Sequence, residues 1–311
     1  MIIKRNFNLI RVVGYVKTEM LFALGAGAVV LFFHIQNGFT LALPFSVAAI
    51  LGSALAIFIA FRNNNSYGRW WEARTLWGGI VNASRVLARL VVTFTDSHAH
   101  QPSYDKTRSE RFKKDAVYAA IAWVHALRLH LRGQNSWHEL RTFLSDEEMD
   151  ELNRAQNKPN FLQLLLGRKI YAAMANGTLG GFDSFQLEGQ LLALANYQGG
   201  CERIKNTPLL RQYDYFTRLF LYTFMLLLPF SLISDFAKMN MVYAMLPVSV
   251  IISFVFAILG KVGEVNEDPF ENRITDVPLT ALCITIERDL RELLGETTLP
   301  PKAAPEKGFL F

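Results

Sequence analysis

Uncharged, mostly apolar stretches occur in two pairs, one near the start of the chain and one well after its middle. They cover residues 21–33, 39–61, 219–234 and 241–260. A mostly apolar run of roughly 18 or more residues is long enough to cross the hydrocarbon core of a bilayer as a helix. The second and fourth stretches reach that length alone, whereas the other two need polar flanks such as 34–37 and 215–218. The pattern predicts four membrane-spanning helices.

The region between the two pairs is predicted to be mostly helical, because apolar residues recur there at helical spacing. Breaks are expected at 133–136, 157–160 and 176–181. Ser145 begins a capping box that opens a short helix. After the last span, Asp276 is the predicted N-cap of a helix that stops at Gly295. Residues 300–308 are predicted to form a flexible tail.

These elements predict an all-α polytopic membrane protein with a helical domain outside the membrane. Its five parts are an amphipathic segment (1–19), two spans (20–61), the helical domain (62–214), two further spans (215–262) and a helix with a tail (263–311). Pro229 and Pro247 fall inside the later spans, where a missing amide hydrogen predicts a kink or a break. No strand pattern is evident.

Charge supports this layout and suggests its orientation. The chain is 51% hydrophobic and only 19% charged, against about 25% charged in a typical soluble domain. Lysine and arginine gather beside the spans at Lys4, Arg5, Arg11, Lys17, Arg62, Arg69, Arg74, Arg203, Lys205, Arg211, Arg218 and Lys261. Residues 34–38 have no lysine or arginine, and 235–240 have only Lys238. Because basic residues mark the cytoplasmic side, both termini and the helical domain are predicted to be cytoplasmic.

The same distribution excludes other classes of protein. The net charge of +5 arises beside the spans, so nucleic-acid binding is not predicted. Cys201 and Cys283 are far apart, as in a reduced compartment. No catalytic serine motif, phosphate loop or zinc spacing is present, and solvated or interfacial positions are expected for the six histidines. We therefore predict neither an enzyme nor a cofactor.

One polar segment, 61–74, reads Phe-Arg-Asn-Asn-Asn-Ser-Tyr-Gly-Arg-Trp-Trp-Glu-Ala-Arg. It follows the second span, so the apolar helix is expected to stop there, with tryptophan and arginine at headgroup depth. Interfacial anchoring is the ordinary role of such residues. The three consecutive asparagines are less ordinary.

Three motifs in order carry a family resemblance. Phe-Arg-Asn-Asn with Tyr-x-Arg-Trp-Trp-Glu-x-Arg (61–74) precedes Gly-x-Cys-Glu-Arg-Ile-x-x-Thr-Pro (199–208) and Glu-Asp-Pro-Phe (267–270). The chain from Asn6 to Gly295 resembles the bacterial branch of the bestrophin ion-channel family. The resemblance implies a homopentamer with one central pore that continues into a helical cytosolic vestibule. It marks as motif or interface residues Arg62, Asn63, Asn64, Arg69, Trp70, Trp71, Glu72 and Arg74.

The resemblance also implies a narrow hydrophobic neck lined by the second span, at Ser53, Ile57 and Phe61. Spacings of four residues put all three on one stripe of a helix, and apolar rings can gate by dewetting. The alternative is that Ile57 and Phe61 pack against neighbouring helices. Ser53 departs from the family, which more often has an apolar residue there, so a wider and wetter neck is expected.

A second constriction is implied at the cytosolic exit of the vestibule, at Phe185 with Phe182 as its neighbour. The alternative is a buried phenylalanine at a helix start. Eukaryotic relatives hold calcium in an acidic run, which here corresponds to Glu264, Glu267, Asp268, Glu271 and Asp276. Arg273 stands where the family has an acid, and a fixed cation opposes metal binding. No calcium site is therefore predicted.

The predicted function is passive conduction of small monovalent ions through a ring of copies in the lipid bilayer. The bacterial resemblance favours sodium and potassium, and the alternative is a chloride or anion channel of the same fold. A secondary transporter and a membrane scaffold are further alternatives. No Asp, Glu, Lys or Arg falls within 39–61, 219–234 or 241–260, whereas coupled transporters usually carry an ionisable residue at depth.

Overall fold

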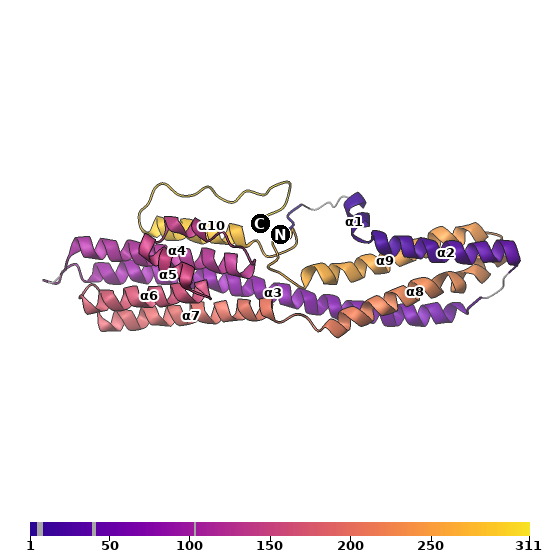
Figure 1. The fold of residues 1–311 in the computed structure, drawn as a ribbon, viewed down its shortest axis with the longest axis horizontal. Helices are drawn as coiled ribbons and strands as arrows, with labels where there is room; N and C mark the ends of the chain where they lie inside the picture. The colour runs from indigo at the N-terminus through magenta and orange to yellow at the C-terminus, as the bar shows by residue number, and fades with distance from the viewer. Residues whose placement is uncertain (5–8, 39–41, 103) are drawn as a thin grey trace. The chain divides into compact units, whose positions relative to one another are not determined.

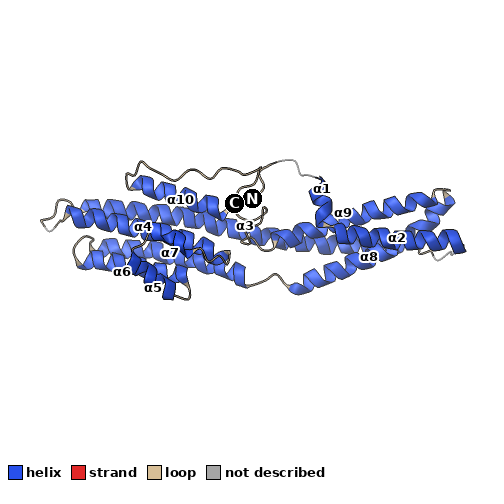
Figure 2. Cartoon of the chain, turned by 45° about the horizontal axis from the view of Figure 1, so that its top comes forward, coloured by secondary structure: helices blue, strands red, loops and turns tan. Residues whose placement is uncertain are grey.

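The structure, a computed structural model, describes the chain except residues 5–8, 39–41 and 103. The described residues are helical apart from turns, loops and two isolated β-bridges (Figure 2). The helices are α1 (Leu9–Tyr15), α2 (Lys17–Asn37), α3 (Phe45–Ser97), α4 (Lys106–Leu131), α5 (Asp146–Arg154), α6 (Lys158–Ala175), α7 (Gly181–Asn206), α8 (Arg211–Lys238), α9 (Met245–Asn266) and α10 (Leu279–Leu293), with short 3₁₀ helices at Trp137–Thr142 and Val242–Ala244. The all-α prediction is confirmed.

The chain forms two compact units, each described by itself below. One, here the membrane unit, comprises Lys4–Trp70 and Pro208–Asp268. The other, here the α4 unit, comprises Met1–Ile3, Trp71–Thr207 and Pro269–Phe311. Part of the predicted amphipathic segment 1–19, and residues 39–41 of the second predicted span, lie outside the described residues.

In the membrane unit, α2, α8, α9 and the first part of α3 run alongside one another (Figure 1). These four helices are long and apolar enough to cross a membrane. Their mutual packing buries an apolar core that includes Leu55, Ile59, Phe224, Leu228 and Ala257. Four predicted spans are thus present as four helices, and α3 begins directly after Pro44.

The prolines of the later spans do not break their helices. Pro229 lies inside α8, which continues to Lys238. Pro247 is in the first turn of α9, which starts at Met245. In a first turn the backbone nitrogen has no intrahelical acceptor, so proline is tolerated there. Neither helix is broken at its proline, and a kink at either position stays a prediction.

α3 does not stop where the apolar run ends. The helix continues through the polar segment 61–74 to Ser97. Buried positions recur at helical spacing along it at Leu55, Ile59, Arg62, Ser66, Ala73, Trp77 and Ile80. The expectation that the helix ends near Phe61 was wrong, because the buried stripe continues past the change in polarity.

In the α4 unit, α4 is the central helix and packs against α6, α7 and α10. Its apolar residues from Ala119 to Leu127, Trp123 included, are buried. The predicted capping box is confirmed, since Glu148 N–H donates to Ser145 Oγ over 3.3 Å and Ser145 N–H to Glu148 Oε2 over 3.0 Å. Both cysteines are free and buried, and burial raises the pKa of Cys201 and of Cys283 to about 12.

Two expectations for the last segment were wrong. α10 begins at Leu279 with Pro278 before it, and Asp276 Oδ2 instead accepts the Arg273 N–H at 3.0 Å. Burial raises the pKa of the Asp276 carboxyl. The tail is docked, because Ile3 N–H donates to the Gly308 carbonyl at 3.0 Å and Phe309 is buried. Backbone bonds to Met1–Ile3 and to α10 replace the predicted flexibility.

Candidate pore helix and its ion-pair network

The membrane part of α3 has one buried and one exposed face. Leu55 and Ile59 are buried in the core. Ser53, Ile57 and Phe61 lie on the other face, where Ile57 is 57% exposed and Phe61 62%. The three predicted neck residues therefore share an exposed stripe, and Ile57 and Phe61 do not pack into the core of their own subunit.

Side-chain size distinguishes this exposed face from those of the other spans. In the membrane part of α3, residues 45–61, most of the exposed residues are small, including Ala49, Ser53, Ala54, Ala56 and Ala60. Those of α2 and α9 are mostly large, as at Leu21, Phe32, Ile251 and Val255. Small side chains let helices approach closely within a membrane. The α3 face is thus suited to contact with protein, whereas the bulkier faces resemble ordinary lipid-facing surfaces.

The hydroxyl of Ser53 has a partner within its own helix. Ser53 Oγ donates to the Ala49 carbonyl at 2.8 Å. Such a bond to the preceding turn is usual for serine in a helix. The exposed stripe is uncharged along this length, as the sequence indicated.

Arg62, the first polar residue of the motif, is buried and ion-paired. Its Nη2 lies 2.7 Å from Asp214 Oδ1 and 3.4 Å from Glu267 Oε2. Asp214 is in α8 and Glu267 directly follows α9, so one guanidinium joins three segments of the membrane unit. For this residue the anchoring interpretation was wrong, since only 3% of the side chain is exposed. Removing one partner of a buried pair leaves an uncompensated charge.

Asn63 fixes the close approach of α3 to α9. Its Nδ2 donates to the Leu259 carbonyl at 2.9 Å. One turn later in α9, a Cβ on Gly263 would lie 2.3 Å from Asn63 Oδ1. Only glycine fits that position without displacing the amide.

The rest of the motif continues along α3. Arg69 Nε donates to the Glu267 carbonyl at 2.7 Å, and its Nη2 is 3.9 Å from Asp268. Asn64 and Trp71 are exposed, Arg74 is half-buried, and the ring of Trp70 stacks on Tyr67 with centroids 6.4 Å apart. In the α4 unit, Glu72 is ion-paired with Arg203. The motif is thus a helical segment, most of whose charged side chains are paired.

The carboxylates of the acidic run 264–276, which begins near the end of α9, contact other residues of the same chain. Besides the pairs of Glu267 and Asp268, Glu264 lies 2.6 Å from Lys261 and Glu271 2.5 Å from Lys205. Asp276 accepts a backbone N–H, as described above. No group of three or more His, Cys, Asp or Glu side chains placed to hold a metal occurs within the described part of the chain. The absence of a calcium site stays a prediction.

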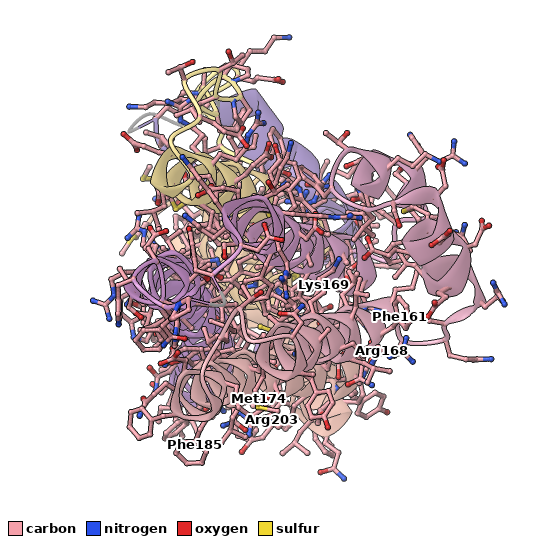
Figure 3. All side chains as sticks on the ribbon, turned by 90° about the vertical axis from the view of Figure 1, so that its left-hand side faces the viewer. Phe161, Arg168, Lys169, Met174, Phe185 and Arg203 are labelled. Carbon is pink, nitrogen blue, oxygen red and sulfur yellow. The ribbon has the colours of Figure 1, made fainter. Side chains whose placement is uncertain are left out.

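The candidates for the second constriction lie in the first turns of α7. Phe182 and Phe185 are both mostly exposed, so the alternative of a buried phenylalanine is wrong. Phe185 lies at the outer edge of the side chains in Figure 3. Between them, Asp183 accepts the Gly180 N–H at 2.9 Å and lies 2.6 Å from His98 Nε2. That pair joins the start of α7 to the residue after α3.

The histidine expectation was wrong for two residues. His98 is paired with Asp183, and His125 is buried, 3.1 Å from Glu287 and stacked on Phe143. Burial by itself raises the pKa of Glu287, but the hydrogen bond from His125 and the ion pair with Arg291 lower it overall. The sequence contains no local signal for either pair, because the partners are 85 and 162 positions apart.

With this geometry in place, comparison with known proteins decides the family. The family model described as Bacterial/Fungal Bestrophin protein matches residues 9–292. This chain is a bestrophin. The resemblance predicted from the three motifs is confirmed.

Curated relatives of this bestrophin carry a channel name. The voltage-dependent anion channel-forming protein YneE of Salmonella typhi is 36% identical over 271 residues, 87% of this chain and 82% of the relative. YneE of Escherichia coli K12 is 34% identical over 276 residues, 89% and 84% of the two chains.

Solved structures show the same fold. A mutant of a bacterial bestrophin homologue from Klebsiella pneumoniae superposes with a TM-score of 0.78 at 30% identity, covering 90% of this chain and 99% of that one. A crystal structure titled only as a membrane protein variant gives 0.80 at 30% identity, covering 91% and 100%. The present bestrophin is therefore a membrane protein with the bestrophin fold.

Proposed function

We propose that this bestrophin is a passive channel for small monovalent ions, formed by five copies around a common axis. The observation that carries the proposal is the exposed, uncharged stripe of Ser53, Ile57 and Phe61 on α3. One such stripe from each copy would form stacked rings of side chains. The small residues beside it would allow the subunits to approach closely, and the rings of Ile57 and Phe61 would form a dewetting barrier.

The contacts of Arg62 and Asn63 would hold the pore helix in place. Arg62 and Asn63 follow the stripe directly and bind α8, α9 and the residue after α9. They would hold the α3 stripe at a constant position relative to the other spans. Phe185 and Phe182 are proposed as the second constriction, with the His98–Asp183 pair positioning the start of α7.

For charge selectivity we favour monovalent cations, on the resemblance to cation-conducting bacterial members. Anion conduction is the second candidate, because the curated relatives are named anion channel-forming proteins. The stripe has no charge with which to choose between them. Selectivity would then depend on groups beyond the neck.

The proposed location is the bacterial inner membrane, with both termini and residues 62–214 and 263–311 on the cytoplasmic side. The basic residues beside the spans support that orientation. We propose no calcium regulation, since the carboxylates of the acidic run already have partners in the chain.

A planar-bilayer recording with asymmetric potassium chloride tests the proposal. A channel gives discrete, unsaturating currents, a coupled carrier saturates, and a scaffold gives none. The sign of the reversal potential separates cation from anion conduction. Cross-linking of the purified protein, read by mass, gives the number of subunits.

Ile57→Ala tests the pore assignment itself. The substitution removes apolar wall and widens the neck, so single-channel conductance is expected to rise. Ile251→Ala is the matched control, because Ile251 is 62% exposed on α9 but is not on the proposed stripe. Equal currents in the two variants and the unaltered protein would exclude α3 as the pore helix.

A further inference from the structure

Two mostly exposed arginines lie at the start of α8, and each shares its carboxylate partner with a buried guanidinium. Arg218 is ion-paired with Asp214, which is also 2.7 Å from Arg62. Arg211 is 3.7 Å from Glu267, which is also 3.4 Å from Arg62. Three guanidiniums, those of Arg62, Arg211 and Arg218, therefore share the two carboxylates of Asp214 and Glu267.

The three arginines differ in burial, and burial determines which of them depends most on the shared carboxylates. The Arg62 side chain is almost fully buried, so water cannot compensate its charge, and it depends on Asp214 and Glu267. Arg211 and Arg218 face solvent, where an ion pair contributes little. The network thus leaves positive charge on the exposed side of α8, available to an external anion.

A shallow cavity, open at the surface, adjoins one of these arginines. It has a volume of about 390 Å³ and is lined by Asp214, Tyr215, Arg218, Leu219 and Tyr222. Residues 211, 215, 218 and 222 recur at spacings of three and four, which places them along one face of α8. The ring of Tyr222 packs edge-on against Phe22 of α2, with centroids 5.0 Å apart.

The cavity lies where α8 changes from polar to apolar. Arg218 is the last charged residue before the apolar stretch 219–234. Arginine and tyrosine at such a boundary lie at headgroup depth, and basic residues on the cytoplasmic side attract anionic lipids. A guanidinium donates paired hydrogen bonds to phosphate oxygens.

We propose that this cavity binds the phosphodiester headgroup of an anionic glycerophospholipid of the inner leaflet. Arg218 and Arg211 contact the phosphate, Tyr215 and Tyr222 donate hydroxyl hydrogen bonds, and Leu219 contacts the start of an acyl chain. Asp214 does not make the site repel the anion, because the three guanidiniums of Arg62, Arg211 and Arg218 outnumber the two carboxylates that they share. The site is separate from the proposed pore stripe on α3.

Native mass spectrometry of the full-length protein in detergent tests the site. The protein is titrated with phosphatidylglycerol, with phosphatidylcholine, and with phosphatidylglycerol in the presence of excess inorganic phosphate. Phosphatidylglycerol is expected to bind more tightly than phosphatidylcholine. Arg218→Gln is expected to weaken it about tenfold, the loss of one charge-assisted contact. Lys238→Gln, an exposed cation at the other end of α8, is the matched control and is expected to leave binding unchanged.

Each other outcome overturns the proposal. Equal retention of the two lipids would exclude recognition of an anionic headgroup. Equal losses in the Arg218 and Lys238 variants would show non-specific attraction, and displacement by inorganic phosphate would assign the site to a soluble anion. Thermal unfolding of Arg218→Gln without lipid checks that the protein still folds. The readout involves no ion current, so a failure of the channel proposal would not alter it.

Discussion

The two units of this bestrophin expose different kinds of side chain. The membrane unit exposes large apolar residues such as Phe32 and Ile251, yet buries Arg62 and Glu267. The α4 unit buries Trp77 and Trp123 and keeps most of its charges on the surface. A continuous hydrophobic exterior is stable in lipid, whereas a mostly polar exterior is stable in water. The units therefore differ in the solvent for which they are built, although both are helix bundles.

One ion pair from each unit extends the comparison to the burial of charge. In the membrane unit the buried guanidinium of Arg62 links three segments. The α4 unit also buries ionisable groups, such as His125 and Glu287, but its Arg85–Asp289 pair lies near the surface, with the arginine about half exposed. Burial makes a charged pair expensive to break, whereas a surface pair contributes little. The buried Arg62 pairs should therefore contribute much more to the free energy of unfolding than the exposed Arg85–Asp289 pair.

The largest expected loss of stability comes from removing the buried guanidinium of Arg62. Arg62→Ala leaves Asp214 and Glu267 without their buried partner and should lower the free energy of unfolding by about 3–5 kcal/mol. Arg85→Gln, which breaks the exposed pair, should cost about 0–1 kcal/mol. Thermal or denaturant unfolding in detergent measures both. Similar losses in the two variants would contradict the comparison.

Helix packing in the membrane unit gives the next largest effect. Gly263→Ala would place a Cβ 2.3 Å from Asn63 Oδ1, so the amide must move and lose its bond to the Leu259 carbonyl. The expected cost is about 1–3 kcal/mol. Gly260→Ala in the same helix meets no atom within 4 Å, so it should be neutral or slightly stabilising. A Gly263 variant as stable as the Gly260 variant would exclude the close approach.

The smallest effect concerns pH and the α4 unit. The pKa of Glu287 is lowered from 4.5 by His125 and Arg291, against the opposing effect of burial. A lowered carboxyl pKa stabilises the folded state above the unfolded value, and that stability is lost as pH falls through the folded value. Stability should therefore decline below about pH 4.5. Near-ultraviolet circular dichroism should show a shallower decline for Glu287→Gln, and parallel curves would remove this pair from the acid response.

Prediction from sequence succeeded where the signal is local. Apolar runs identified the four spans, and the Ser145 capping box was visible within four residues. Prediction failed where the partner is distant: nothing near Arg62 reveals Asp214, and nothing near Gly308 reveals Ile3. The polar segment 61–74 was expected to end a helix because its composition changes, but the contacts that keep α3 helical come from α8 and α9. The neck assignment came from family resemblance, and the sequence could not show that its stripe is exposed.

The hydrogen bond from Ser53 to the Ala49 carbonyl has a consequence for a conducting ring. Since the hydroxyl proton is donated within the helix, the oxygen of this exposed side chain can serve as an acceptor. In the proposed ring, these oxygens would accept hydrogen bonds from water. The neck would then hold water at this level, and the dewetting barrier would rest on Ile57 and Phe61.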